Sequence, residues 1–147
     1  MVHNKQYSLL ELKVIWKDDD MLELMVYSSN SRYSGKTEVY VTSETLLSFA
    51  KSLLNYPKEE KQLFYQAGER DSYAYFSMKY YVIGFTGLIG VEIELEENVA
   101  TEFRPEEKSK LKLEIIVEPS AIDKFQKELT TLAKNQDGKA TLYGTAN

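Results

Sequence analysis

The chain has 147 residues, of which 43% are apolar and 28% are charged, with a formal net charge of −5 and no cysteine. This size and balance predict one soluble globular domain over residues 1–147, and the absence of cysteine excludes disulfides, thiolate chemistry and Cys-type zinc sites. The negative charge argues against a nucleic-acid partner, whose phosphates are bound mainly by lysine and arginine, and no run of about 18 apolar residues predicts a membrane span.

Three strands are expected at the N-terminal end. Residues 9–17 alternate between apolar and polar types, which predicts a half-buried strand. Three aspartates at 18–20 interrupt the alternation, which resumes over residues 22–27, so the two segments are expected to form a hairpin. A third strand is expected through residues 37–41. The side of the first strand that is expected to be buried carries Leu10, Leu12, Val14 and Trp16.

A helix is expected next. Thr42 or Ser43 can cap its start, apolar residues then recur at helical spacing, and Pro57 ends it. Four more strands are expected, namely a short one near residues 63–67, an aromatic one over 73–83, a clearly alternating one over 89–96 and a last one over 110–117.

A second helix is expected from Pro119, because proline suits the first turn of a helix. Ser120 and Asp123 resemble a capping box at its start. Gly138 stops the helical pattern, and the remaining tail is expected to fray or to add a short edge strand. The predicted fold class is therefore α+β, with one or more antiparallel sheets of about seven strands in total, in the order βββα-ββββα, and with two helices packed on the sheet.

Residues 38–53, which are expected to run from a strand into a helix, are similar in sequence to residues 114–129. The second segment begins 76 positions later (114 − 38 = 76), and the two share five identities in sixteen positions. The strands upstream match at a different offset, 69, with residues 22–26 facing residues 91–95. This similarity suggests an internal duplication, in which a unit of three strands and a helix occurs twice. An ordinary α+β domain with two similar junctions is the alternative.

Residues that could carry chemistry are few. The single histidine, His3, lies near the start of the chain, so no histidine-based triad or metal site is expected. The aspartates at 18–20 lack the calcium-loop pattern and are expected to form a solvated turn. Gly84 and Gly87 are expected to serve a turn, and Gly90 to mark a bulge or a close backbone contact. No cofactor and no metal are expected.

Most candidate functional residues are expected at the surface of the protein. On the strand over 89–96 the alternating glutamates at 92, 94 and 96 are expected to face water. Lys110 and Lys112 of the next strand are expected to pair with these glutamates. Tyr27 and Tyr40 are further tyrosines that could point outward from their strands, and exposed tyrosines are common in interfaces. The candidate partner-binding residues are Asp18, Asp19, Asp20, Tyr73, Tyr75, Tyr81, Glu92, Glu94 and Glu96.

Three segments of the chain together carry a resemblance to a known family. They are Ile15 to Met21, Ser34 to Tyr40, and the glycine-rich turn before Val91-Glu92-Ile93. They resemble small bacterial immunity proteins of the wall-associated (polymorphic) toxin type. The resemblance implies a cytoplasmic protein that binds and blocks a cognate toxin domain, often a nuclease with a basic cleft. It brings no catalytic motif with it.

Three hypotheses follow. The first is a non-enzymatic cytoplasmic immunity protein that neutralises a basic toxin domain through an acidic and aromatic surface. The second is a small-molecule-binding or hydrolytic α+β domain with a pocket between sheet and helices. The third is a self-assembling subunit, such as a homodimer, with the strand over 73–83 as its seam.

Overall fold

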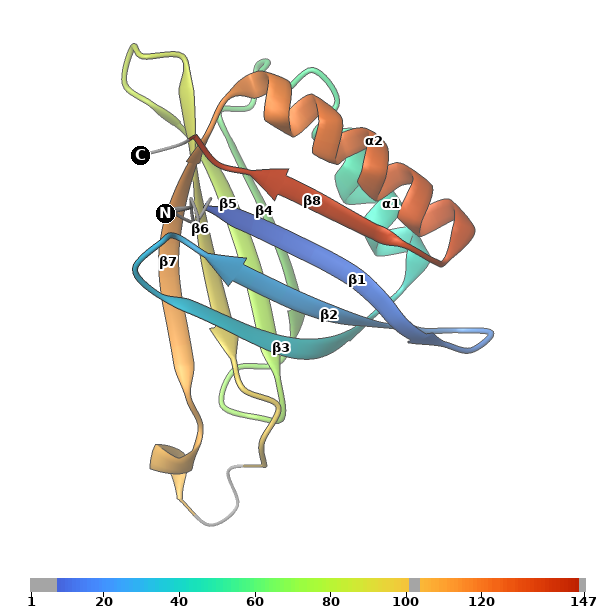
Figure 1. The fold of residues 1–147 in the computed structure, drawn as a ribbon. Helices are drawn as coiled ribbons and strands as arrows, with labels where there is room; N and C mark the ends of the chain where they lie inside the picture. The colour runs from blue at the N-terminus through green and yellow to red at the C-terminus, as the bar shows by residue number, and fades with distance from the viewer. Residues whose placement is uncertain (1–7, 101–103, 146–147) are drawn as a thin grey trace, which may run out of the picture.

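The computed structural model describes residues 8–100 and 104–145. Figure 1 shows two antiparallel sheets that cross at a steep angle, with the two helices lying side by side along one border of the molecule. Sheet A has the strand order β3-β2-β1-β8, and sheet B has the order β4-β5-β6-β7. The elements are β1 (Leu9–Lys17), β2 (Leu22–Ser29), β3 (Ser34–Val41), α1 (Ser43–Ser52), β4 (Gln62–Gly68), β5 (Tyr75–Ile83), β6 (Leu88–Glu96), the 3-10 turn η1 (Pro105–Glu107), β7 (Lys110–Val117), α2 (Pro119–Asn135) and β8 (Lys139–Tyr143).

The predicted α+β class and the order βββα-ββββα are confirmed. The described strands number eight and form two sheets of four. The eighth strand, β8, comes from the C-terminal tail and lies at the edge of sheet A beside β1. In the part of the chain that the structure describes, neither helix is long and apolar enough to cross a membrane.

The element order β-β-β-α-β occurs twice in the chain, first as β1-β2-β3-α1-β4 and then as β5-β6-β7-α2-β8. Within each sheet, three strands come from one half, and the fourth comes from the other half. Strand β4 completes the sheet of the second half, and β8 completes the sheet of the first. The repeat expected from the sequence is therefore present in the topology, with the last strand of each half exchanged.

The register of paired strands gives the residue offsets between equivalent strands of the two halves. Val39 pairs with Leu24 in sheet A, and Ile115 pairs with Val91 in sheet B. The first members of these pairs lie 76 positions apart (115 − 39 = 76), and the second members lie 67 apart (91 − 24 = 67). The expected upstream offset of 69 is thus wrong by two residues. Side chains alternate with period two, so an error of two leaves every residue on its expected face.

The two helices meet at equivalent positions. Gln126 lies 76 residues after Ala50, and its Nε2 donates a hydrogen bond to the Ala50 carbonyl oxygen over 3.1 Å. A residue that touches its own equivalent is expected beside a two-fold axis. The equivalent leucines Leu53 and Leu129 are both fully buried in the common core. The two similar segments of the sequence therefore supply the two helices that pack against each other.

Trp16 was expected on the buried side of β1, and this prediction is wrong. A register shift between Val14 and Trp16 indicates a β-bulge, after which Trp16 lies opposite Glu23 of β2. Glu23 belongs to the outer side of its strand, since the neighbouring Leu22 and Leu24 are buried. One extra residue reverses the facing of everything after it, so the Trp16 side chain points outward and is 47% exposed.

The helix starts were predicted with mixed success. Thr42 caps α1, because its side chain accepts a hydrogen bond from the Thr45 N–H over 3.2 Å. Helix α1 ends at Ser52, before the expected stop at Pro57. Pro119 lies in the first turn of α2 as expected, but the N-cap residue is Glu118 and makes no side-chain cap. The expected capping box at the start of α2 is therefore wrong.

A matched pair of leucines tests the central role of the helix pair. We expect Leu53→Ala and Leu129→Ala each to lower the free energy of unfolding by about 2–5 kcal/mol, since each leaves a cavity in the core. The control is Leu54→Ala, whose side chain is 49% exposed and whose loss is expected to cost about 0.5 kcal/mol. Urea unfolding at equilibrium measures all three, and equal losses at positions 53 and 54 would contradict the helix packing described above.

Candidate functional site

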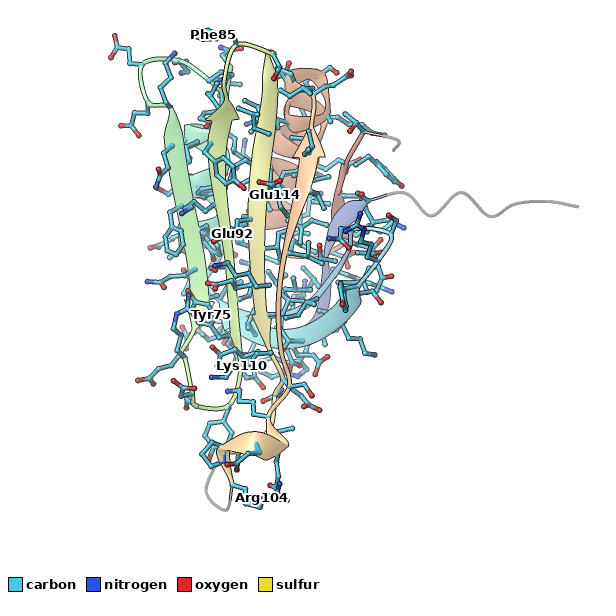
Figure 2. All side chains as sticks on the ribbon, turned by 90° about the vertical axis from the view of Figure 1, so that its left-hand side faces the viewer. Tyr75, Phe85, Glu92, Arg104, Lys110 and Glu114 are labelled. Atoms are coloured by element: carbon cyan, nitrogen blue, oxygen red, sulfur yellow. The ribbon has the colours of Figure 1, made fainter. Side chains whose placement is uncertain are left out.

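The outer face of sheet B carries five of the residues singled out from the sequence. Figure 2 views this face directly and shows Tyr75, Glu92, Glu114 and Lys110 on neighbouring strands. The five residues on this face are Tyr75 and Tyr81 of β5 and Glu92, Glu94 and Glu96 of β6. Tyr73 was expected on the same strand, but β5 begins at Tyr75, so Tyr73 lies in the turn between β4 and β5.

Glu96 was expected to face water, and it is instead buried, with 3% of its surface exposed. Its carboxylate accepts a hydrogen bond from the Asp71 N–H over 2.8 Å and lies 3.4 Å from Nζ of Lys108. The Lys108 side chain is itself fully buried and donates to the Ser72 carbonyl oxygen. The turn before β5 and the segment before β7 thus fold over the end of β6 and enclose an ion pair.

Tyr75 was expected to be an exposed anchor, and it is buried as well, with 2% of its surface exposed. The guanidinium of Arg70 lies over its ring at 4.2 Å from the centroid, and its hydroxyl donates to Gln66 over 3.0 Å. Arg70 also pairs with Glu94, and this hydrogen bond raises the pKa of the guanidinium. One arginine from the β4–β5 turn therefore covers a tyrosine and neutralises a carboxylate of the expected acidic strip.

Tyr81 lies across Gly90 of the neighbouring strand. The two residues are paired in register, and a Cβ atom on Gly90 would lie 2.3 Å from Cε2 of the Tyr81 ring. The hydroxyl of Tyr81 donates to Glu114 on β7. Burial, followed by this hydrogen bond, raises the pKa of Tyr81 well above its ordinary value. The close contact expected at Gly90 is therefore with an aromatic ring that spans three strands.

Two further carboxylates at this face, those of Glu92 and Asp71, also have cationic neighbours. Strands β6 and β7 are paired as expected, and Lys112 lies 3.9 Å from Glu92 on the diagonal. Lys110 pairs with Asp71, and this hydrogen bond lowers the pKa of the Asp71 carboxyl. The acidic strip expected on β6 is thus largely balanced by the chain's own lysines and arginine, which weakens its attraction for a basic partner.

The aspartates at 18–20 lie in the β1–β2 turn, as expected. Oδ1 of Asp18 accepts hydrogen bonds from the N–H groups of Asp20 and Met21 at 2.9 and 2.7 Å. These two donors lower the pKa of the Asp18 carboxyl. The turn extends away from sheet B (Figure 1), so the three aspartates do not join the glutamates of β6. Among the described residues, no group of three or more potential ligands is arranged to hold a metal ion.

The outer face of sheet A carries an exposed aromatic pair that the sequence did not predict. Trp16 on β1 and Tyr40 on β3 meet edge to face, with their ring centroids 6.1 Å apart. Glu23 of β2 lies between them in register, since it pairs with both residues. Tyr40 is 55% exposed. The bulge in β1 is what brings Trp16 to this face, and alternation alone offers no signal for a bulge.

A groove of about 530 Å³ runs between β3 and the β4–β5 turn, next to this pair. Tyr40 lines one wall, and Tyr73, which is 60% exposed, lines the other. Its only charged lining residues among those described are Glu38 and Glu69. We call this feature, together with Trp16, the aromatic groove. Its other lining residues are Val39, Gly68, Ser72, Ala74 and Asn98.

The structure therefore divides the candidate residues into three groups. Tyr73 joins Tyr40 and Trp16 at the aromatic groove, and the aspartates at 18–20 follow directly after β1, the strand that carries Trp16. The five candidates on sheet B are held within its own network of contacts. His3 lies outside the described residues. An open acidic and aromatic surface is present, but on a different part of the molecule from the one expected.

The buried ion pair on sheet B can be tested through two lysines of the same face. We expect Lys108→Met to lower the free energy of unfolding by about 3 kcal/mol, because it leaves the Glu96 carboxylate buried without its nearest cation. Lys112→Met removes a largely exposed lysine and is expected to cost less than about 1 kcal/mol. Equal effects in chemical denaturation would argue that Glu96 is solvated. Addition of Glu96→Gln to Lys108→Met is expected to restore part of the loss.

The contact between Tyr81 and Gly90 predicts strong coupling. Gly90→Ala is expected to destabilise the protein by about 1–3 kcal/mol, because the added methyl group collides with the ring of Tyr81. In a Tyr81→Ala background the methyl group has room, and alanine suits a strand at least as well as glycine, so the same change is expected to cost nothing. A double-mutant cycle measures this coupling, and simple additivity would contradict it.

The chain was compared with protein-family models, with curated proteins and with solved structures, and none of the three comparisons found a match.

Proposed function

We propose that this protein is a non-enzymatic binding protein of the immunity type, which acts in the cytoplasm and neutralises a cognate toxin domain. The observation that carries this proposal is the aromatic groove. Three large aromatic side chains, Trp16, Tyr40 and Tyr73, are each about half exposed there. Exposed tryptophan and tyrosine supply much of the binding energy in protein interfaces.

The charge around the groove favours a basic partner. Glu38 and Glu69 line it, Glu23 lies between Trp16 and Tyr40, and the aspartate turn extends from the same end of β1. An arginine or lysine of the partner would meet aromatic faces and carboxylates together, and both attract cations. The toxin's active site would be blocked by coverage, with the carboxylates steering association.

The other two hypotheses predict different surfaces. A seam in which the strand over 73–83 pairs edge to edge with a second copy would need a free strand edge, whereas β5 lies inside sheet B between β4 and β6. A small-molecule or hydrolytic site was expected between sheet and helices, where a groove separates α1 from β4. That groove runs along a strand edge, a shape better suited to an extended chain than to a compact substrate.

Alanine substitutions in the aromatic groove test the proposal. The proposal expects a toxin domain to be encoded next to the gene for this protein, and that domain is the binding partner in the test. We expect Trp16→Ala, Tyr40→Ala and Tyr73→Ala each to weaken its binding by about 30-fold or more, as hot-spot residues do. The controls are Tyr33→Ala and Phe85→Ala, which remove exposed aromatic side chains away from the groove. Calorimetry or surface plasmon resonance measures the affinities.

Protection of cells that express the toxin should follow the same order as the affinities. The association rate with wild-type protein is expected to fall as salt rises, because steering by carboxylates is screened. The proposal fails if the purified protein neither binds the toxin nor protects against it. Equal losses in the groove variants and in the two controls would reject the aromatic groove as the binding surface.

A further inference from the structure

The four edge strands of the two sheets are unequally protected. Edge strands expose unpaired backbone groups, and charged residues, prolines or bulges normally keep other chains away from them. Strand β3 carries Lys36 and Glu38, β8 carries Lys139, and β7 carries two lysines and a glutamate. Strand β4, Gln62–Gly68, carries no charged residue and no proline.

Strand β4 is also regular and unpaired along its outer edge. Its pairing with β5 runs without a register shift from Gln62 to Gly68. Among the described residues no strand lies beyond it, and Figure 2 shows β4 at the border of sheet B. Phe64 and the two glutamines of the strand are exposed. A regular, uncharged edge of this kind is a template for one more strand.

The edge faces a groove of about 670 Å³, whose second wall is α1. Phe49 and Leu63 form an apolar floor, and the hydroxyl of Thr45 lies 3.2 Å from that of Tyr65. The described residues that line the groove include two charged ones, Glu44 and Glu60. A helix beside an open strand edge is a geometry that accepts an extended peptide as an added strand.

The two carboxylates lie at opposite ends of the groove. Glu60 comes just before β4, whereas Glu44 lies in the first turn of α1, one residue from Thr45, which contacts the far part of β4 at Tyr65. The lining part of β4, from Gln62 to Gln66, spans about 13 Å at roughly 3.3 Å per residue. A strand added there would place residues i and i+4 near the two glutamates.

We propose that the edge of β4 binds an extended peptide segment of another protein, in which two basic residues lie four positions apart. Backbone hydrogen bonds to β4 would supply affinity, and the two glutamates would select the basic side chains. The inference does not rest on the proposed function, since this groove and the aromatic groove share no lining residue.

A second copy of this chain is a poorer occupant of the same edge. If two β4 strands paired antiparallel, the Gln62 end of one would meet the Gln66 end of the other. Glu60 of each copy would then lie near Glu44 of its partner, and like charges placed together oppose association. The net charge of −5 on each chain adds to this repulsion.

The test uses a synthetic probe, the capped peptide Lys-Val-Thr-Val-Lys, and isotope-labelled full-length protein. Titration followed by NMR is expected to shift the amide signals of β4 and α1 and to slow hydrogen exchange at the edge of β4. Two control peptides have the same length. In one both lysines are replaced by glutamate, and in the other alternate backbone nitrogens are methylated. Each control is expected to bind at least about tenfold more weakly, because one removes charge attraction and the other removes backbone donors.

Protein variants separate this edge from other surfaces. The charge reversal Glu44→Lys with Glu60→Lys is expected to weaken the lysine peptide and to strengthen the glutamate peptide. Glu106→Lys, an exposed change outside the groove, is the control and is expected to leave both affinities unchanged. Shifts confined to other strands, equal binding of all three peptides, or no binding at millimolar concentration would each overturn the proposal. A dimer detected by sedimentation, with amide signals of β4 that shift with protein concentration, would overturn it in favour of a second copy.

Discussion

The exchange of the last strand between the two halves is the constraint on which the rest of the structure depends. Each half supplies three antiparallel strands and a helix, and its remaining strand completes the other half's sheet. The helices between these strands must then pass from one sheet to the other, and they pack against each other at equivalent positions, as the Ala50–Gln126 contact shows. Neither half has a complete sheet without the other, so the domain is expected to unfold as one unit.

The exchange also decides which surfaces are open. The strands that join the two halves, β4 and β8, lie at sheet edges, and so do β3 and β7. The turn that follows β4 carries Arg70 and Asp71 over sheet B, where they pair with carboxylates and lysines of β6 and β7. The same turn carries Tyr73 to the aromatic groove, where it lies on the wall across from Tyr40. One loop therefore closes one face of the molecule and builds a wall of the groove on another.

The two sheet faces illustrate how charge acts on recognition. On sheet B most carboxylates have a cation of the same chain within 4 Å, so their field outside the molecule is small. At the aromatic groove Glu38 and Glu69 line an open space beside exposed rings, where a partner's cation could reach them. A count of acidic residues along a strand does not distinguish these cases. What distinguishes them is the position of the neighbouring cations.

Alternation and helix signals in the sequence were sufficient for the class, the order of elements and most buried faces. Val91, Ile93 and Leu95 are buried as their alternation predicts, and Thr42 caps α1. The repeat of the strand-to-helix junction was visible because its equivalent leucines, Leu53 and Leu129, are both buried in the core. These features follow from local propensity and from the period of burial, which each segment carries by itself.

The exchange of strands, the burial of Tyr75 and Glu96, and the exposure of Trp16 were decided only by the tertiary structure. Tyr75 and Glu96 do face away from the core, as alternation indicates, but Arg70 of the β4–β5 turn covers Tyr75, and Lys108 from the segment before β7 covers Glu96. Trp16 lies on the outer side of β1, and not on the inner side that alternation predicts, because one bulge residue reverses the facing of the residues after it. Periodicity reports which side of its own strand a residue occupies. What lies over that side depends on contacts between distant segments, which a local pattern does not contain.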